Sequence, residues 1–135
     1  MMNFDLSNIK KEDLALISPL VLAYIGDAVF EVFVRTKVVN DGFIKTAKLH
    51  TLATGFVKAK AQADSLDKIY DSLTIEEQDI IRRGRNANSK TIPKNADIAD
   101  YKKATALEAL IGYLFLSKND DRLNEIIDMI LKPYD

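Results

Sequence analysis

Two acidic residues lie inside apolar segments that have the length and pattern of buried helices. Asp27 stands near the middle of "VLAYIGDAVFEVFVR", residues 21–35, and Glu108 stands within "TALEALIGYLFL", residues 105–116. An ionised carboxylate is costly to bury unless it finds a partner. The neighbours of Glu108 three and four positions away carry no charge, and Asp27 has the like-charged Glu31 four positions on.

Two such carboxylates on the helices of one bundle could meet, and they would then repel each other unless a cation lay between them. Hard divalent cations, above all magnesium, prefer carboxylate oxygens and water. Magnesium–carboxylate sites commonly serve phosphoryl chemistry. The alternative is that both residues occupy narrow solvent-facing stripes and that Glu31 forms a salt bridge with Arg35, the more frequent situation for charges on helices.

Composition narrows the chemistry further. The 135 residues contain no cysteine and a single histidine, His50, which excludes thiolate metal sites, disulfides and multi-histidine metal sites within one chain. A Ser-His-Asp triad could use only His50, which we expect to pack or to face solvent. The N-terminus lacks the pattern of a secretory signal, and the longest uncharged run is well short of the roughly 20 residues that span a membrane. We therefore expect a soluble, cytoplasmic protein with one domain, residues 1–135.

Basic residues concentrate in one part of the chain. Residues 82–103 hold seven Lys/Arg and two Asp, a balance of +5, whereas the remainder has a balance of −6. A local basic surface on a mildly acidic body suggests contact with a polyanion. Charge counting alone favours the simpler interpretation, a solvated loop with helix ends.

The elements that would position these residues are helical nearly throughout, which predicts an all-α fold. Ser18 before Pro19 predicts a capped helix that runs to about Val39 and, being apolar on most faces, is the central and most buried one. The T-x-x-E pattern of Thr74 and Glu77 predicts a capping box. The further predicted segments are one helical stretch over 46–66, a short helix over 67–73, helices over 75–85, 101–117 and 121–131, and a loop over 85–97.

Both carboxylate segments carry recognisable motifs. "YIGDAVFEVFVR" resembles the signature helix of the ribonuclease III family, and "ALEALIGYLFL" resembles its second carboxylate motif, Asp-x-x-Glu-Ala-x-x-Gly. The resemblance implies that Asp27 and Glu108 are catalytic and bind Mg²⁺. Ala23 and Thr105 stand where the family motifs carry a further glutamate and aspartate.

Those two departures are shared by the Mini-III ribonucleases, which the segments 18–35 and 82–115 closely resemble. As in those enzymes, we expect no double-stranded RNA-binding domain after the last predicted helix. The resemblance implies a ribonuclease III catalytic-domain-like helical bundle, an obligate homodimer and magnesium-dependent cleavage of double-stranded RNA that leaves 5′ phosphates. It also implies maturation of the ends of the large-subunit (23S) ribosomal RNA precursor, with a ribosomal protein as a partner that could present the RNA.

With an RNA substrate implied, the basic segment gains a role in reaching phosphates across the minor groove of an A-form duplex. The residues expected to bind RNA are Arg82, Arg83, Arg85, Asn86, Lys90 and Lys94. Gly26 and Gly112 either give the site close backbone access or pack between crossed helices, and the sequence favours neither.

Two rival interpretations stay open. Ala23 and Thr105 favour a catalytically silent ribonuclease III-like module for RNA binding or ribosome assembly, whereas the presence of both Asp27 and Glu108 favours the enzyme. An unrelated helical bundle that serves as a protein-interaction adaptor would show no salt-dependent affinity for RNA.

Overall fold

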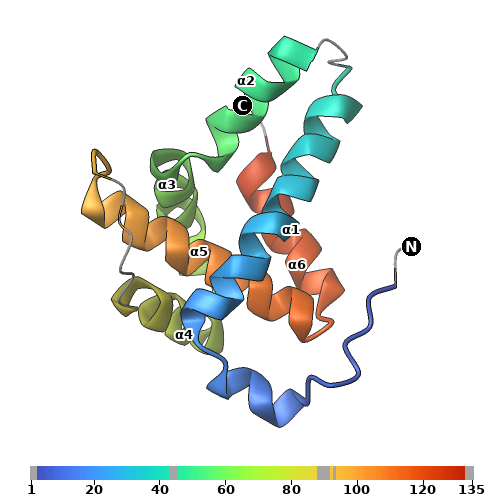
Figure 1. The fold of residues 1–135 in the computed structure, drawn as a ribbon, viewed down its shortest axis with the longest axis vertical. Helices are drawn as coiled ribbons and strands as arrows, with labels where there is room; N and C mark the ends of the chain where they lie inside the picture. Colours follow the sequence, from blue (N-terminus) through green and yellow to red (C-terminus); the bar gives the residue numbers. More distant parts are fainter. Residues whose placement is uncertain (1–2, 43–45, 88–91, 93, 133–135) are drawn as a thin grey trace.

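The structure is a computed structural model that describes residues 3–42, 46–87, 92 and 94–132. These residues form helices and no strands, which confirms the predicted all-α fold (Figure 1). None of the described helices combines the length and the apolar character needed to cross a bilayer. The elements in chain order are the 3₁₀ helix η1 (Lys11–Leu16), α1 (Pro19–Asn40), α2 (Thr46–Val57), α3 (Ala59–Ile69), the 3₁₀ helix η2 (Tyr70–Ser72), α4 (Ile75–Asn86), α5 (Ile98–Leu116) and α6 (Asp120–Leu131).

The central helix is α5, and α1, α3, α4 and α6 pack around it (Figure 1). The expectation that the helix from Pro19 is the most buried is therefore wrong. Although α1 is apolar on most faces, it buries only part of its circumference and leaves Val21, Tyr24 and Val32 exposed. The buried residues of α5 are Ala104, Ala106, Leu107, Ala109, Leu110, Ile111, Gly112 and Leu114.

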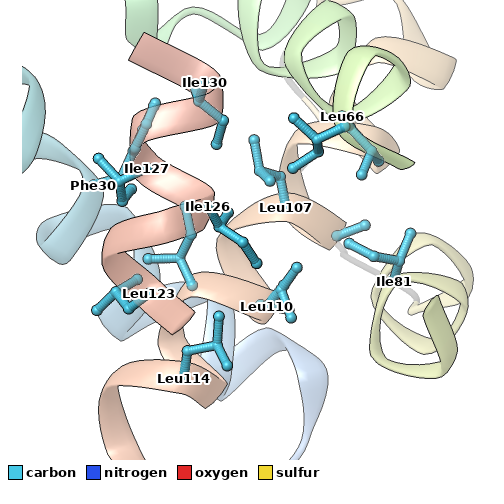
Figure 2. Packing of buried hydrophobic residues seen from close by; sticks show 14 of the residues in the cluster. Phe30, Leu66, Ile81, Leu107, Leu110, Leu114, Leu123, Ile126, Ile127 and Ile130 are labelled. Carbon is cyan, nitrogen blue, oxygen red and sulfur yellow. The ribbon is translucent and has the colours of Figure 1, made fainter. Parts of the chain in front are cut away.

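Large aliphatic side chains of α5 form the middle of the core. Figure 2 shows Leu107 and Leu110 among side chains contributed by the four surrounding helices. Fully burying a side chain of this size stabilises a fold by about 1.5–3 kcal/mol. The surrounding side chains include Phe30 of α1, Leu66 of α3, Ile81 of α4 and Ile126 of α6, all almost completely buried.

Glycines allow α1 and α5 to cross with their backbones in contact. A Cβ added at Gly26 would lie 1.7 Å from the carbonyl oxygen of Glu108, and one added at Gly112 would lie 2.0 Å from the carbonyl oxygen of Leu22. Both distances are far inside van der Waals contact, so the two glycines are packing residues between crossed helices. The crossing also fixes which residues of the two helices face each other.

Several predicted helix ends are confirmed. The Ser18 hydroxyl accepts a hydrogen bond of 3.3 Å from the backbone N–H of Leu20 at the start of α1. The Thr74 hydroxyl accepts one from the N–H of Glu77, whose side chain accepts one from the N–H of Thr74, so the capping box opens α4. Helix α4 runs to Asn86, one residue beyond the predicted end, and α5 starts at Ile98 rather than at residue 101.

The single helical stretch predicted over 46–66 is wrong, because the chain breaks at Lys58 into α2 and α3. Lys58 has ψ 151°, an extended conformation, and the Gln62 amide donates a hydrogen bond of 2.7 Å to the carbonyl oxygen of Val57, the last residue of α2. That bond satisfies a carbonyl that the broken helix leaves without its usual partner. The short helix predicted over 67–73 is also wrong, since α3 extends to Ile69 and only a 3₁₀ turn follows.

We predict that Gly26→Ala lowers the free energy of unfolding by about 1–3 kcal/mol or more, because the added methyl group forces the α1–α5 crossing apart. Urea unfolding at fixed pH measures the change. Gly55→Ala is the matched control: Gly55 lies in α2, and its added Cβ would meet nothing within 4 Å other than its chain neighbours and the backbone of its own helix. It should raise stability by up to about 1 kcal/mol, as glycine-to-alanine changes in helices do. Equal effects of the two substitutions would contradict the close crossing.

Candidate active site

Asp27 of α1 and Glu108 of α5 come together where the two helices cross. Asp27 directly follows Gly26, whose Cα faces the backbone of Glu108. The Asp27 side chain is exposed and that of Glu108 is half-buried, and the two carboxyl groups are close enough for a hydrogen bond and for mutual repulsion. The structure thus brings together two residues that are 81 positions apart in the chain.

The pKa of Glu108 is strongly raised. Burial is the largest cause, followed by the hydrogen bond and the negative charge of Asp27, and together they raise the pKa of Glu108 from its ordinary value of 4.5 to about 8. Glu31 adds a smaller repulsive contribution, whereas Gln62 acts in the opposite direction. Near neutral pH, Glu108 therefore keeps its proton unless a positive charge compensates the pair.

The ion pair expected from the alternative interpretation is also present. Arg35 Nε lies 3.0 Å from Glu31 Oε2, one turn further along α1 than Asp27. Arg35 is therefore paired with Glu31. The neighbour that the structure gives Glu108 is Asp27, a second carboxyl group, which carries no compensating positive charge. Within the stripe on α1, Glu31 and Arg35 thus form a surface salt bridge, whereas Asp27 faces the carboxyl group of Glu108 on α5.

The residues at the crossing fit a hard divalent cation. Two carboxyl groups converge there, and the buried amide oxygen Oε1 of Gln62, whose Nε2 lies 3.5 Å from Glu108 Oε2, has no hydrogen-bond partner. Oxygen donors of this kind are those that Mg²⁺ prefers. In the part of the chain that the structure describes, no three or more Asp, Glu, His or Cys side chains are placed so that they could hold a metal ion together. A cation held here would thus take much of its coordination shell from water and substrate.

The two positions that depart from the family motifs contribute no carboxylate. Ala23 is buried in the core. Thr105 lies one turn before Glu108, and its hydroxyl donates a hydrogen bond of 3.1 Å to the carbonyl oxygen of Tyr101 within α5. Its role in the structure is therefore local to the helix.

The residues expected to bind RNA fall into three groups. Arg82, Arg83, Arg85 and Asn86 lie together in the last turns of α4, and Lys94 is exposed in the segment before α5. Lys90 lies outside the described residues. Arg82 Nη2 lies 2.5 Å from Asp79 Oδ1 on the same helix. The negative charge of Asp79 weakens the attraction between Arg82 and an approaching phosphate.

Gln62 is the residue at this site that the sequence reasoning missed. It lies on α3, only 3% exposed, in register with Leu66 and Ile69 on the face that packs inward. A polar residue at a core position of an amphipathic helix is the signal that could have found it, because a buried amide needs partners.

Comparisons with known proteins identify the family and the fold of the chain. The model of the Ribonuclease III domain family matches residues 20–119. A Mini-ribonuclease 3 of Thermoanaerobacter sp. (strain X514) is 48% identical over 88% of this chain and 84% of its own length. A Mini-ribonuclease 3 of Staphylococcus aureus is 41% identical over 93% and 96%. The X-ray structure of a Fusobacterium nucleatum protein superposes with a TM-score of 0.80 at 34% identity, covering 89% of this chain and 96% of that one.

The chain therefore belongs to the ribonuclease III family, and within it to the Mini-ribonuclease 3 proteins. It is an endoribonuclease of that family. Members of the family generally use divalent metal ions, and the domain implies a double-stranded RNA substrate.

We predict that, without divalent cations, the protein loses stability as pH rises from about 5 to 8.5. Because the pKa of Glu108 is higher in the folded state than its ordinary 4.5, the folded state binds more protons in this range, and unfolding becomes easier as they are released. Glu108→Gln removes this penalty, so it should be more stable than the wild type at pH 8.5 and the difference should close near pH 5. Thermal unfolding in EDTA at several pH values measures both.

Glu12→Gln is the control, since Glu12 is an exposed acidic residue of η1 that undergoes the same change from carboxyl to amide. It should leave the pH profile of the wild type unchanged. A difference between wild type and Glu108→Gln that stays constant from pH 5 to 8.5 would contradict the raised pKa.

Proposed function

We propose that this protein is a magnesium-dependent endoribonuclease that cleaves double-stranded RNA at a site built on Asp27 and Glu108. The observation that carries the proposal is the convergence of these two carboxyl groups at the α1–α5 crossing, where burial and mutual repulsion raise the pKa of Glu108 to about 8. Such a pair favours a divalent cation because the cation relieves the repulsion and the cost of ionising Glu108.

In this proposal, Asp27 and Glu108 hold Mg²⁺ directly or through water. A cation bound there would lower the pKa of a water molecule and would neutralise charge that develops on the scissile phosphate. Asp27, being exposed, is the group that faces the substrate, whereas Glu108 anchors the site from the buried side. Hydrolysis that places the attacking oxygen on the phosphorus and releases the 3′ oxygen leaves a 5′ phosphate and a 3′ hydroxyl.

The substrate we propose is a paired end of the large-subunit ribosomal RNA precursor, and a ribosomal protein could present it. Arg82, Arg83, Arg85 and Asn86 at the end of α4, together with Lys90 and Lys94, would bind the duplex backbone. The clustering of the first four in two helical turns supports this role, because phosphates along one strand of a duplex recur at short intervals.

We also propose that the protein acts as a homodimer through the outer face of α1. Val21, Tyr24 and Val32 are 56%, 82% and 54% exposed, and their spacing of three and eight residues places them on one face together with the exposed Ala28. An apolar stripe of this kind in an otherwise well-packed domain supports burial against a second copy of the chain. This interface would also explain why α1 is apolar on most faces without being the central helix.

We predict that a long perfect RNA duplex is cut in the presence of Mg²⁺ and not in EDTA, and that Asp27→Asn slows cutting by about a hundredfold or more, because loss of the carboxylate weakens cation binding. Gel analysis of end-labelled RNA measures the rate and identifies the 5′ phosphate. Asp64→Asn, at an exposed site on α3 paired with Lys60, is the control and should cut at the wild-type rate. Full activity of Asp27→Asn would remove the proposed site.

The inactive variant also allows RNA binding to be measured without cleavage. Its affinity for the duplex should fall steeply with salt, and the further changes Arg83→Ala and Arg85→Ala should each lower the slope of log affinity against log salt by about one. The matched change Lys11→Ala, on η1, should leave the slope unchanged. If the wild type binds the duplex but does not cut it, the result would indicate that a partner must present the RNA.

We predict that Tyr24→Asp yields a monomer, because it places a charge in the proposed α1–α1 interface. Sedimentation velocity measures the oligomeric state. Ile75→Asp is the matched control, since Ile75 is a large aliphatic residue that is 88% exposed on α4, outside the α1 stripe, and it should leave the dimer intact. A monomeric wild type, or dimers of both variants, would contradict the proposed interface.

A further inference from the structure

Gln62 is one of two buried polar or charged residues among those that the structure describes, and it is the one without a complete set of partners. Glu77, the other, forms the capping box and an ion pair of 2.8 Å with Arg122. Gln62 keeps its amide in the core at 3% exposure, and its Oε1 accepts no hydrogen bond. An unsatisfied buried amide oxygen destabilises the folded state, so its presence asks for an explanation beyond packing.

The contacts of Nε2 fix the orientation of this amide. Nε2 donates to the carbonyl oxygen of Val57 at 2.7 Å, and a carbonyl can only accept, so the nitrogen must be on that side. The same Nε2 lies 3.5 Å from Glu108 Oε2, to which its second hydrogen can point. The Oε1 atom of the same amide is covered by the protein and has no hydrogen-bond partner.

Gln62 thus connects the helix break at Lys58 with the carboxylate pair. The bond to Val57 ties the amide to the end of α2, and α3 and α5 are packed together, so the amide has little freedom to turn away from Glu108. A donor held in this way favours the ionised form of Glu108 and one orientation of its carboxylate.

We propose that Gln62 is a positioning residue of the active site: its Nε2, fixed by the bond to Val57, orients the Glu108 carboxylate toward the divalent cation. The inference rests on the proposed function. In this chain Ala23 and Thr105 supply no carboxylate, and the neutral side chain of Gln62 would help to fix the position of the metal ligand Glu108. Residues that orient metal ligands commonly affect metal affinity about 10- to 100-fold.

The test is the affinity of the RNA-free protein for Mn²⁺, used in place of Mg²⁺ and titrated calorimetrically. Gln62→Met keeps the volume and removes both polar atoms, and it should weaken Mn²⁺ binding by about tenfold or more. Gln78→Met is the matched control, because the Gln78 amide also donates to a backbone carbonyl, that of Tyr70 at 3.2 Å. It should bind Mn²⁺ like the wild type. The cleavage rate of Gln62→Met should recover at high Mg²⁺, so the change appears mainly in the metal concentration needed.

A purely structural role of Gln62 would lower stability and leave Mn²⁺ affinity within about twofold of the wild type, and that result would overturn the inference. If Gln62→Met does not fold, Gln62→Asn keeps the amide and withdraws it by one methylene, and the same loss of affinity is expected. Mn²⁺ binding by the wild type that depends on Asp27 but not on Gln62 overturns this inference alone. A wild type that binds no Mn²⁺ overturns the proposed metal site together with it.

Discussion

The close crossing of α1 and α5 is the constraint on which the rest of the molecule depends. Two glycines, Gly26 and Gly112, let the backbones touch, and each stands within a turn or so of a carboxylate of the candidate site. Any side chain at these positions would separate the helices and with them Asp27 and Glu108. The same contact therefore closes the core and sets the distance between the groups that we propose for chemistry.

Holding two carboxyl groups at such a crossing opposes stability, and this opposition is what makes the site respond to cations. Burial and the nearby Asp27 disfavour the ionised form of Glu108, so the fold without metal keeps a proton there at neutral pH. Binding a divalent cation must displace that proton, which makes the affinity depend on pH. Helix α5 packs against α1, α3, α4 and α6, and this packing prevents Asp27 and Glu108 from moving apart to relieve their repulsion.

Sequence reasoning found the two carboxylates because each is out of place in an apolar helix, and the resemblance to a known family paired them. It could not tell that α5 rather than α1 lies at the centre of the fold. Both helices are rich in apolar residues, and composition does not distinguish apolar residues that pack into the core from apolar residues that stay exposed on the surface. Sequence reasoning also joined α2 and α3, since neither glycine nor proline marks the break at Lys58. The Gln62 amide, five residues further along the chain, caps the carbonyl oxygen of Val57 at this break, and the spacing of apolar residues does not reveal such a side-chain cap.

Helix α1 shows how a single segment can carry several constraints at once. Successive residues of a helix point about 100° apart, so one face can pack through Gly26 and Phe30, the next can present Asp27 and Glu31, and a third can expose Val21, Tyr24 and Val32. If the third face meets a second copy of the chain, the two carboxylate stripes border the interface. Dimerisation would then orient two cleavage sites toward one duplex. A substitution on the first face of α1 would affect the site through helix packing, one on the second face through its charge, and one on the third face through dimerisation.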